Sequence, residues 1–410
     1  MTCGWHLLKA GHKVKILERE YIVGGLARSF LVDGKWVPLS YHHVMLPDKN
    51  TLSYIKLFGF STELRWTRSP QVLWYDYRCY TITPWNILFF KPLDPISRLR
   101  MLYLGAYVWA RKDWDDLRNM DCAEWLNKVA GKNNTEIIFD KLMAIKFNMP
   151  LSSVSAAWLG KRMHQSVRNK DMYGYIDSGW QGLLNKMSEE IAAMGGEILT
   201  GFDVSNMTDR TVTGKGPNRQ RASLPYDLAV STIPPPALYS ILDLPDRVKA
   251  PLGAIKYKSI ISFVCASKEV LSSNYWSVVL KPHLIFGGFF NFSVVSGIRD
   301  MNGDAIYYFF TYMENDDPLL AYEDAKLKEI YVNDIRKIFP GFSLSWYKVF
   351  RLRDSQPVFR KNYENLPIGL TENIYLSGVY RQYPQPRTMD AAFAGGHETA
   401  KYIIDKYGKN

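Results

Sequence analysis

The spacing of apolar residues along the chain changes period several times, and each change predicts an element. Residues 2–10 have the three-to-four-residue spacing of a helix, which stops at Gly11. Residues 13–18 then alternate as a strand that ends on Glu18. A tight turn at Asp33-Gly34, between apolar flanks, predicts a hairpin. The chain therefore begins with the elements of an α/β fold.

Further along, helical and strand patterns occur in alternating blocks. Residues 51–170 are mostly helical, apart from an aromatic and β-branched stretch over 71–83 that predicts a small hairpin. Residues 179–194 form a clear amphipathic helix, residues 254–315 have the pattern of strands, and residues 388–407 form a final helix. Because the blocks are interleaved, we expect neither domain to be contiguous.

The composition is that of a globular chain with a basic surplus. Its 410 residues are 47% hydrophobic, enough to bury a large core in two domains. The formal net charge of +11 favours an anionic ligand or an acidic lipid surface. Lys and Arg are scattered among acids, so nucleic acid is not an expected partner. No His, Asp or Glu cluster has metal spacing, and neither do the four cysteines, Cys3, Cys79, Cys122 and Cys265.

One apolar stretch suits a membrane interface, although it is too short for a membrane span. About 18 uninterrupted apolar residues are needed to cross a bilayer, and residues 101–110 reach only about half of that length. Arg98, Arg100, Arg111 and Lys112 flank the stretch. An interfacial helix is one interpretation, and a buried helix is the favoured one. With no signal-peptide pattern either, we expect a cytoplasmic protein and leave peripheral membrane contact open.

The strongest chemical signal is the order of elements around Glu18. In a nucleotide-binding βαβ unit, the second strand ends in an acid that hydrogen-bonds a ribose hydroxyl of the cofactor. Arg19 follows at once, and Gly24-Gly25 lets the backbone approach a pyrophosphate or a ring without a Cβ clash. Arg28 then adds a fixed positive charge for a phosphate. An acid at a strand end is often only a surface residue, so the prediction depends on the combination.

Together, the segments LLKAGHKVKILERE and VGGLARSF resemble the N-terminal segment of the flavin-containing amine oxidase superfamily, which includes protoporphyrinogen oxidases and carotenoid desaturases. The resemblance implies FAD as cofactor and an α/β fold: a Rossmann-like, glutathione-reductase-like FAD-binding domain with an interleaved α+β substrate domain. In that family a G-x-G-x-x-G loop opens the first helix, whereas the match here begins after it. We therefore expect a truncated N-terminus and weak FAD binding; a degenerate protein is the alternative.

A segment near the C-terminus resembles the same family. The order strand, glycine, loop and helix implies that Gly378 lies beside the cofactor, with Thr388, Met389 and Asp390 at the start of the last helix. Backbone amides at a helix start can approach the N1/O2 edge of a flavin, where negative charge develops on reduction. Many members have an acid directly after the glycine, whereas this chain has Val379.

Two middle segments also resemble the family and set the expected domain boundaries. Val204 resembles the valine whose strand lays its backbone against the adenine, and residues 227–234 resemble the buried strand that closes the FAD domain. We expect the FAD-binding domain to comprise residues 1–44, 171–240 and 366–410. The substrate-binding domain then comprises residues 45–170 and 241–365.

Candidate catalytic groups are fewer, because hydride acceptance belongs to the flavin and needs few protein acids or bases. His43, with His42, follows the segment that should run toward the flavin; a structural pair in a turn is the alternative. Lys146 is either near the flavin N5 through a water or an exposed helical lysine. The aromatic strands over 286–292 and 307–312 either line an apolar substrate cavity or fill a core.

The resemblance implies an FAD-dependent oxidoreductase that removes hydride from a C–N or C–C bond of a bulky, partly hydrophobic small molecule. Dioxygen or another acceptor would reoxidise the flavin. Two alternatives stay open. A mutase of the UDP-galactopyranose type shares the cofactor architecture, and Arg351, Arg353 and Arg360 would suit a diphosphate. An inactive binding or scaffold protein that keeps the fold would show no flavin spectrum.

Overall fold

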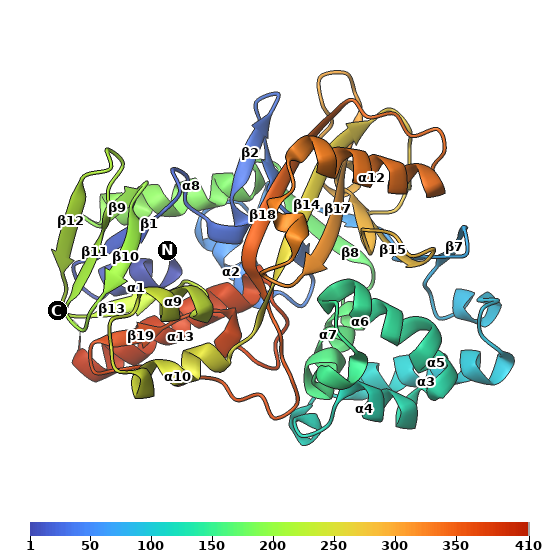
Figure 1. The fold of residues 1–410 in the computed structure, drawn as a ribbon, viewed down its shortest axis with the longest axis horizontal. Helices are drawn as coiled ribbons and strands as arrows, with labels where there is room; N and C mark the ends of the chain where they lie inside the picture. The colour runs from blue at the N-terminus through green and yellow to red at the C-terminus, as the bar shows by residue number, and fades with distance from the viewer. Residues whose placement is uncertain (409–410) are drawn as a thin grey trace.

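The computed structural model describes residues 1–408, and its elements form three regions (Figure 1). One region holds both chain ends, the second is built on a large sheet, and the third is helical. The α-helices are α1 (Thr2–Lys9), α2 (Lys49–Leu57), α3 (Pro95–Ala110), α4 (Cys122–Val129), α5 (Lys132–Asn134), α6 (Asp140–Phe147), α7 (Ala156–Arg168), α8 (Gly179–Ala193), α9 (Pro235–Ile241), α10 (Asp246–Ala254), α11 (Phe292–Ser296), α12 (Asp324–Ile338) and α13 (Met389–Tyr407).

The region with both chain ends, at the left of Figure 1, contains short strands between helices. Two strand pairs are parallel: β1 (Lys15–Glu18) with β9 (Glu197–Thr200), and β13 (Ala229–Ser231) with β19 (Ile374–Leu376). A three-stranded antiparallel sheet lies beside them, made of β10 (Asp203–Met207), β11 (Thr211–Lys215) and β12 (Arg221–Pro225). Parallel pairs need long crossovers, so segments distant in the sequence build this region.

The first and last helices of the described chain pack against each other in this region. A Cβ added to Gly396 of α13 would lie 2.8 Å from Cβ of Thr2, so only glycine permits this approach. Beneath the contact lies a small buried cluster that α1, β19 and α13 share: Cys3, Leu7, Tyr375, Ala400 and Ile403. The two ends of the chain therefore stabilise one common core.

The second region is a seven-stranded sheet with α12 on one face (Figure 1). In spatial order its strands are β18 (Trp346–Pro357), β14 (Tyr257–Ser267), β17 (Ala305–Met313), β16 (Gly288–Asn291), β15 (Trp276–Lys281), β6 (Val72–Tyr75) and β7 (Arg78–Thr81). Alternation along β17 divides its aromatic rings between two cores. Tyr307 and Phe309 pack under α12, whereas Phe310 and Tyr312 face the opposite core.

The third region consists of α3 to α7, at the lower right of Figure 1, around a separate apolar core. Two smaller sheets share a core with α8 and the large sheet: a hairpin of β2 (Ser29–Val32) and β3 (Lys35–Pro38), and a sheet in the order β4 (Val44–Met45), β8 (Met172–Ile176), β5 (Leu64–Arg68). The expected domain boundary separates β8 from β5, yet the two strands are hydrogen-bonded. The division into two domains therefore stays a prediction.

Most of the predicted elements are present, including the β2–β3 and β6–β7 hairpins and the amphipathic helix α8. Three expectations need correction. The strand pattern over 254–315 is interrupted, since the chain after Asn291 turns into the short helix α11, which Gly297 ends at φ 67°. The strands β11 and β12 were not predicted from the sequence. The stretch 101–110 is not a buried helix, because α3 exposes a whole apolar face.

Candidate functional site

β1 delivers Glu18 to the carboxyl end of the parallel strands, as predicted. Its register partner in β9 is Thr200, and one of its carboxylate oxygens accepts a hydrogen bond from the backbone N–H of Glu20 at 2.9 Å. Ligands of open α/β sheets bind at this end of the strands. Arg19, in contrast, lies at the surface with 72% of its side chain exposed, 3.5 Å from Glu20.

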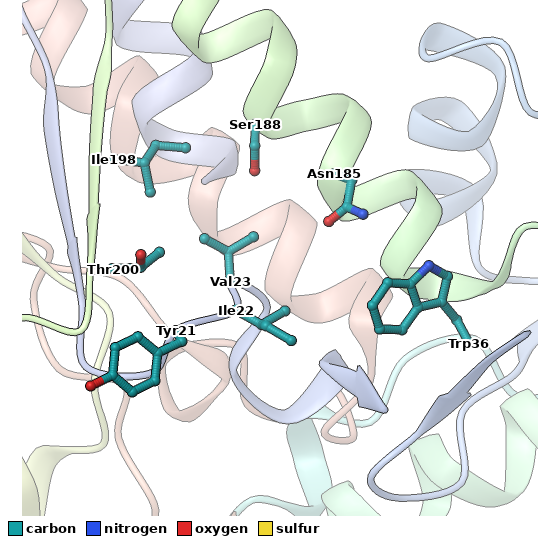
Figure 2. A pocket seen from close by; sticks show the side chains of 8 residues that line it. All are labelled: Tyr21, Ile22, Val23, Trp36, Asn185, Ser188, Ile198 and Thr200. Atoms are coloured by element: carbon teal, nitrogen blue, oxygen red, sulfur yellow. The ribbon is translucent and has the colours of Figure 1, made fainter. Parts of the chain in front are cut away.

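A cavity of about 380 Å³ lies next to this strand end (Figure 2). The loop after Glu18, the hairpin, α8 and β9 enclose it, and the side chains that line it are Tyr21, Ile22, Val23, Trp36, Asn185, Ser188, Ile198 and Thr200. A mainly apolar wall with a few amide and hydroxyl groups is typical of a small-molecule site. Thr200 joins the cavity to the strand end that carries Glu18.

The double glycine is explained by backbone conformation and by close packing. Gly24 has φ 130°, and an added Cβ would lie 2.5 Å from the Leu184 side chain of α8. Gly25 has φ 55° and open space around it. Both conformations disfavour L side chains. Arg28 follows, largely buried, with its guanidinium 2.9 Å from the carboxylate of Glu20. The loop therefore presents a fixed positive charge beside backbone that lacks side chains.

At the other end of the chain, α13 begins where predicted. The side chain of Thr388 caps the helix and accepts the N–H of Ala391 at 3.1 Å. The first N–H groups of a helix have no intrahelical acceptor. Those of Met389 and Asp390 therefore have no acceptor within α13 and can donate to a ligand. Gly378, before the helix, has extended backbone, and an added Cβ would lie 2.5 Å from the ring of Tyr380. The helix start thus has the backbone N–H groups that the prediction requires, and their contact with a flavin stays a prediction.

The carboxylate of Asp390 has a structural partner that the sequence did not indicate. One oxygen accepts the backbone N–H of Thr51 and the other accepts the side-chain amide of Asn50, both at 2.9 Å. Both partners lie in the first turn of α2. The carboxylate therefore joins the starts of two helices, where the helix dipoles favour a negative charge. Val204 lies apart from this end, in β10, packed in one cluster with Leu17 of β1.

His43 lies half-buried between aromatic rings, with half-buried His42 beside it in the chain. Nδ1 of His43 is 3.0 Å from the hydroxyl of Tyr275, and its ring makes edge contacts with Tyr173 and Tyr275. Burial, then the charges of Arg162 and His42, lowers the pKa of His43 to about 3. Burial likewise lowers the pKa of His42 to about 4, although its hydrogen bond to the carbonyl of Ser40 opposes this. Both rings are therefore neutral at neutral pH.

Lys146 of α6 points into the protein, which rules out the exposed helical lysine. Its ammonium nitrogen lies 3.4 Å from the hydroxyl of Tyr312 and 4.9 Å from the centre of that ring. Burial, then the charges of Arg387 and Arg162, holds the pKa of Lys146 well below its ordinary value. We call Lys146, Arg162 and Arg387 the cationic cluster. They come from α6, α7 and the loop before α13, respectively.

The cationic cluster has no full counter-charge in residues 1–408. Arg162 lies over the ring of Trp276 at 5.5 Å, and Arg387 donates to the carbonyl of Ser355 at 3.0 Å. Asp48 is an acid that interacts with Arg162. Burial raises the pKa of Asp48 to about 7, so its carboxyl group is only partly ionised at neutral pH. Partly buried cations without an ionised partner are unfavourable unless a ligand supplies the negative charge. The cluster is therefore suited to an anion.

A group of aromatic rings adjoins the cluster. Half-buried Tyr41 stacks on the buried Phe290 with ring centres 3.8 Å apart, and its hydroxyl lies 2.9 Å from that of Tyr312. Phe310 lies 5.2 Å from Tyr41. Both faces of the aromatic strands thus fill buried cores, one under α12 and one beside the cationic cluster, and a role in lining a substrate cavity stays a prediction.

A second cavity, of about 710 Å³, opens at the end of the large sheet. Tyr257 lines it, and the charge of Arg387 acts on the same side chain, so the cavity adjoins the cationic cluster. Of the three arginines considered for a diphosphate, only Arg360 lines it. Arg351 is engaged with Asp324 and two carbonyl oxygens, and Arg353 donates to the carbonyl of Asn315 at 3.0 Å. The diphosphate role expected for Arg351 and Arg353 is thus not supported.

The sequence analysis missed the residues that complete the site. Arg162, Arg387, Tyr41 and Tyr312 come from four segments and meet only in the folded chain. The one available signal was the position of Arg387 shortly before the helix start at Thr388. Arg162 gave no signal, because a lysine or arginine on a helix is usually exposed.

The residues present fit FAD. Glu18 offers a carboxylate for ribose hydroxyls, Arg28 and the Gly24-Gly25 backbone suit a pyrophosphate, and the free N–H groups at the start of α13 suit the electron-rich edge of the isoalloxazine. This combination, on parallel strands at both ends of the chain, defines the class: a flavin-dependent oxidoreductase fold. Which atoms hold the cofactor stays a prediction.

Comparison with known proteins makes the assignment more specific. The sequence model of the family "flavin containing amine oxidoreductase" matches residues 1–404, and the chain belongs to that family. It is therefore an FAD-dependent oxidoreductase, as the N-terminal resemblance implied. No curated protein sequence matches the chain.

Solved structures share the fold over nearly the whole chain. A protein from Exiguobacterium sp. 255-15, provisionally named a protoporphyrinogen oxidase, has 14% identity and a TM-score of 0.75, covering 99% of this chain and 96% of that one. Reduced UDP-galactopyranose mutase has 16% identity and a TM-score of 0.76, covering 99% and 93%. Putrescine oxidase bound to putrescine has 16% identity and a TM-score of 0.70, covering 98% and 96%. At such identities these likenesses show the fold alone.

Three further features of residues 1–408 bear on partners. No helix in this range is long and apolar enough to cross a membrane. No group of three or more His, Cys, Asp or Glu side chains is placed to hold a metal ion there. The four cysteines are free thiols, and only Cys79 is exposed.

Proposed function

We propose that the chain oxidises a C–N or C–C bond of a bulky, partly apolar small molecule that carries an anionic group. The observation that supports this most directly is the half-buried ring of Tyr41, backed by the buried Phe290 and Tyr312, beside the cationic cluster. An apolar ring system would pack on Tyr41, and a carboxylate or phosphate would be held by the cluster. When bound, FAD supplies the hydride acceptance.

The charge of the site separates this proposal from oxidation of a diamine. A dication such as putrescine needs acids to hold its ammonium groups, whereas the groups here are Lys146, Arg162 and Arg387. Like charges placed close together raise the free energy of the complex. A polycarboxylate with an apolar core, such as a porphyrinogen, avoids that repulsion.

Lys146 has two roles in this proposal. Burial lowers the pKa of Lys146 and so favours its neutral amine, the form that can accept a proton. In its charged form it pairs with the anionic group of the substrate. Tyr312 orients it, because the lysine nitrogen lies 3.4 Å from the tyrosine hydroxyl.

The test follows the reduction of bound flavin under anaerobic conditions. We expect a porphyrinogen to bleach the visible flavin absorbance and putrescine to leave it unchanged. In K146M reduction should be at least about a hundredfold slower, the ordinary minimum for loss of a proton-transfer group. The control K132M changes a lysine with 82% side-chain exposure in α5 and should behave like the wild type. Bleaching by putrescine but by no carboxylated compound would refute the proposal.

A sugar-nucleotide mutase is the second candidate. The cavity of about 710 Å³ favours it, since Arg360, Lys256 and Lys258 line it and cations hold phosphates. Lys258, however, is already paired with Glu314. Conversion of UDP-galactopyranose to another ring form by the reduced protein, without net oxidation, would favour this candidate. Failure of R360A to weaken binding of the nucleotide would count against it.

A further inference from the structure

The outer face of α3 is apolar along its whole length. Ile96, Leu99, Tyr103 and Trp109 recur at three-, four- and six-residue intervals, and each is between 53% and 68% exposed. The inward face buries Ser97, Leu104 and Val108 instead. Exposed apolar residues are ordinary one by one, but a contiguous set on one helix indicates an interaction surface.

A neighbouring loop extends this face. Trp85 and Phe89, 78% and 74% exposed, belong to the segment just before α3. Arg98 of α3 holds that segment in place, since its guanidinium donates to the carbonyls of Leu88, Phe90 and Leu93 at 3.0, 3.2 and 2.8 Å. We call the six exposed side chains the end surface: Trp85, Phe89, Ile96, Leu99, Tyr103 and Trp109. α3 and the segment before it lie at the lower right of the ribbon in Figure 1.

The start of α3 is also firmly held. The side chain of Asp94 caps the helix, accepting the N–H of Ser97 at 3.0 Å and a hydrogen bond from Asn133 at 2.6 Å. Pro95 occupies the first helical position, where its fixed φ favours a helix. The end surface is therefore preorganised, so binding a partner costs little ordering entropy.

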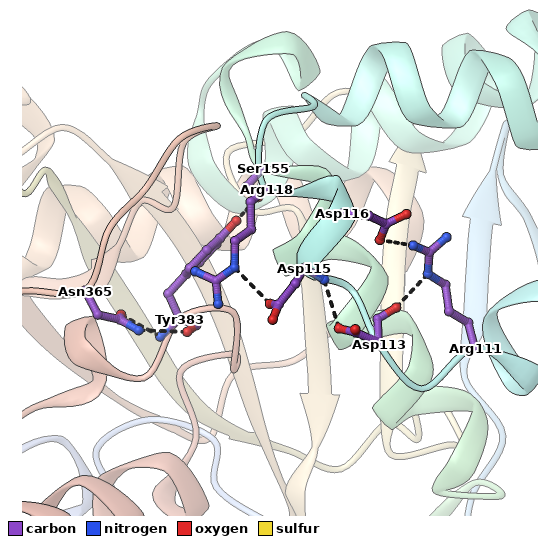
Figure 3. A network of polar contacts seen from close by, with 8 residues as sticks. All are labelled: Arg111, Asp113, Asp115, Asp116, Arg118, Ser155, Asn365 and Tyr383. Atoms are coloured by element: carbon purple, nitrogen blue, oxygen red, sulfur yellow. Dashed lines mark hydrogen bonds and ion pairs between the residues drawn. The ribbon is translucent and has the colours of Figure 1, made fainter.

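The charges around the end surface are predominantly free cations. Lys91, Arg100 and Lys112 are exposed beside it. Two acids of the following loop are paired, as Figure 3 shows: Asp116 with Arg111, and Asp115 with Arg118 at 2.8 Å, whereas the carboxylate of Asp113 accepts the N–H of Asp115 at 3.0 Å. The same loop is bound to the body of the protein through Arg118, which lies 5.0 Å from the ring of Tyr383. The end surface therefore combines apolar side chains with a positive rim.

We propose that the end surface docks on an anionic lipid membrane, lying in the interface and not crossing it. Trp and Tyr are enriched at the interface between lipid and water, and an apolar helix face with basic flanks binds anionic lipid through burial and electrostatic attraction. The net charge of +11 adds long-range attraction to the same surface. A protein partner would be expected to bring acids to the rim, and a second copy brings the same cations.

The test is co-sedimentation of the full chain with vesicles, which needs no flavin. The vesicles are phosphatidylcholine alone or phosphatidylcholine mixed with phosphatidylserine. We expect binding to the mixed vesicles, weakened by high salt. The variant F89S/L99S should bind at least about tenfold more weakly, since it removes two apolar side chains that the interface would bury. K91E/K112E should also bind about tenfold more weakly or worse, because basic residues near the surface are attracted to anionic lipid.

The matched control is V270S/M301S, which removes two side chains that are 67% and 80% exposed but lie in the sheet region, away from α3. It should bind like the wild type, and thermal unfolding shows that each variant is folded. Absence of wild-type binding to the mixed vesicles would overturn the proposal. So would equal binding of F89S/L99S and the wild type. A dimer in sedimentation velocity that F89S/L99S abolishes, without vesicle binding, would show instead that the end surface joins two copies.

Discussion

His43 should make the protein less stable in mild acid, and replacing it should remove that sensitivity. The ring lies between Tyr173 and Tyr275, and Arg162 and His42 are the charged or titratable groups that act on it. Glutamine retains a hydrogen-bonding group for the Tyr275 hydroxyl but does not titrate. The change to test is therefore H43Q.

The size of the effect follows from the pKa of His43, about 3 in the folded protein against the ordinary 6.5. Because the folded pKa is the lower one, the unfolded chain binds more protons at every pH between the two values, and stability falls as the pH drops below 6.5. Between about pH 8 and about pH 5 the unfolded chain gains roughly 2 kcal/mol from protonating this ring. The loss continues to the folded pKa.

The assay is urea unfolding, followed by tryptophan fluorescence, at about pH 8 and about pH 5. Wild type and H43Q can differ in stability at the higher pH, so the quantity compared is the loss between the two pH values. H43Q should lose roughly 2 kcal/mol less than the wild type. H283Q, at an exposed histidine, should show the wild-type loss. An identical loss in H43Q and wild type would show that the ring is accessible to protons, and the reasoning would fail.

Three other substitutions test the fold and the cofactor end. In G160A the new Cβ would lie 2.1 Å from ring carbons of Trp114, so unfolding free energy should fall by about 1–3 kcal/mol; G105A, with open space around it, should not be destabilised. D121A removes the cap that accepts the Glu124 N–H at 2.9 Å and should cost about 1 kcal/mol in denaturant unfolding. E18Q should weaken FAD binding by about tenfold in a flavin-release titration, whereas E189Q, on the exposed side of α8, should not.

Local sequence patterns were sufficient to predict the elements that depend on interactions between residues close together in the chain. The strand ending at Glu18 and the helix starting at Thr388 follow from alternation, glycine stops and capping, all contained within a few residues. The segment after Asn291 has equally strong strand residues, yet packing against β17 and the turn at Gly297 make it helical. Tertiary contacts decided that element, and no short window records them.

The cofactor contacts and the cationic cluster also differ in whether a local sequence pattern can predict them. Cofactor contacts depend on backbone turns and strand ends, which leave motifs such as Gly24-Gly25. The cationic cluster depends on Lys146 and Arg162 pointing inward from separate helices, and periodicity assigns polar residues to the outside. The reverse error occurred in α3, where an apolar stretch was assigned to the inside and its side chains face outward.

The shared core of the first and last helices has a consequence for how the protein is made. β13 cannot pair until β19 has been synthesised, and the side of α1 that packs on α13 stays open until α13 emerges, although α1 also contacts α8. During translation the nascent chain therefore displays this side of α1 while the segments between the two helices are made. Removal of α13 would leave that side of α1 exposed. For this protein, dependence on chaperones should be set by the emergence of α13.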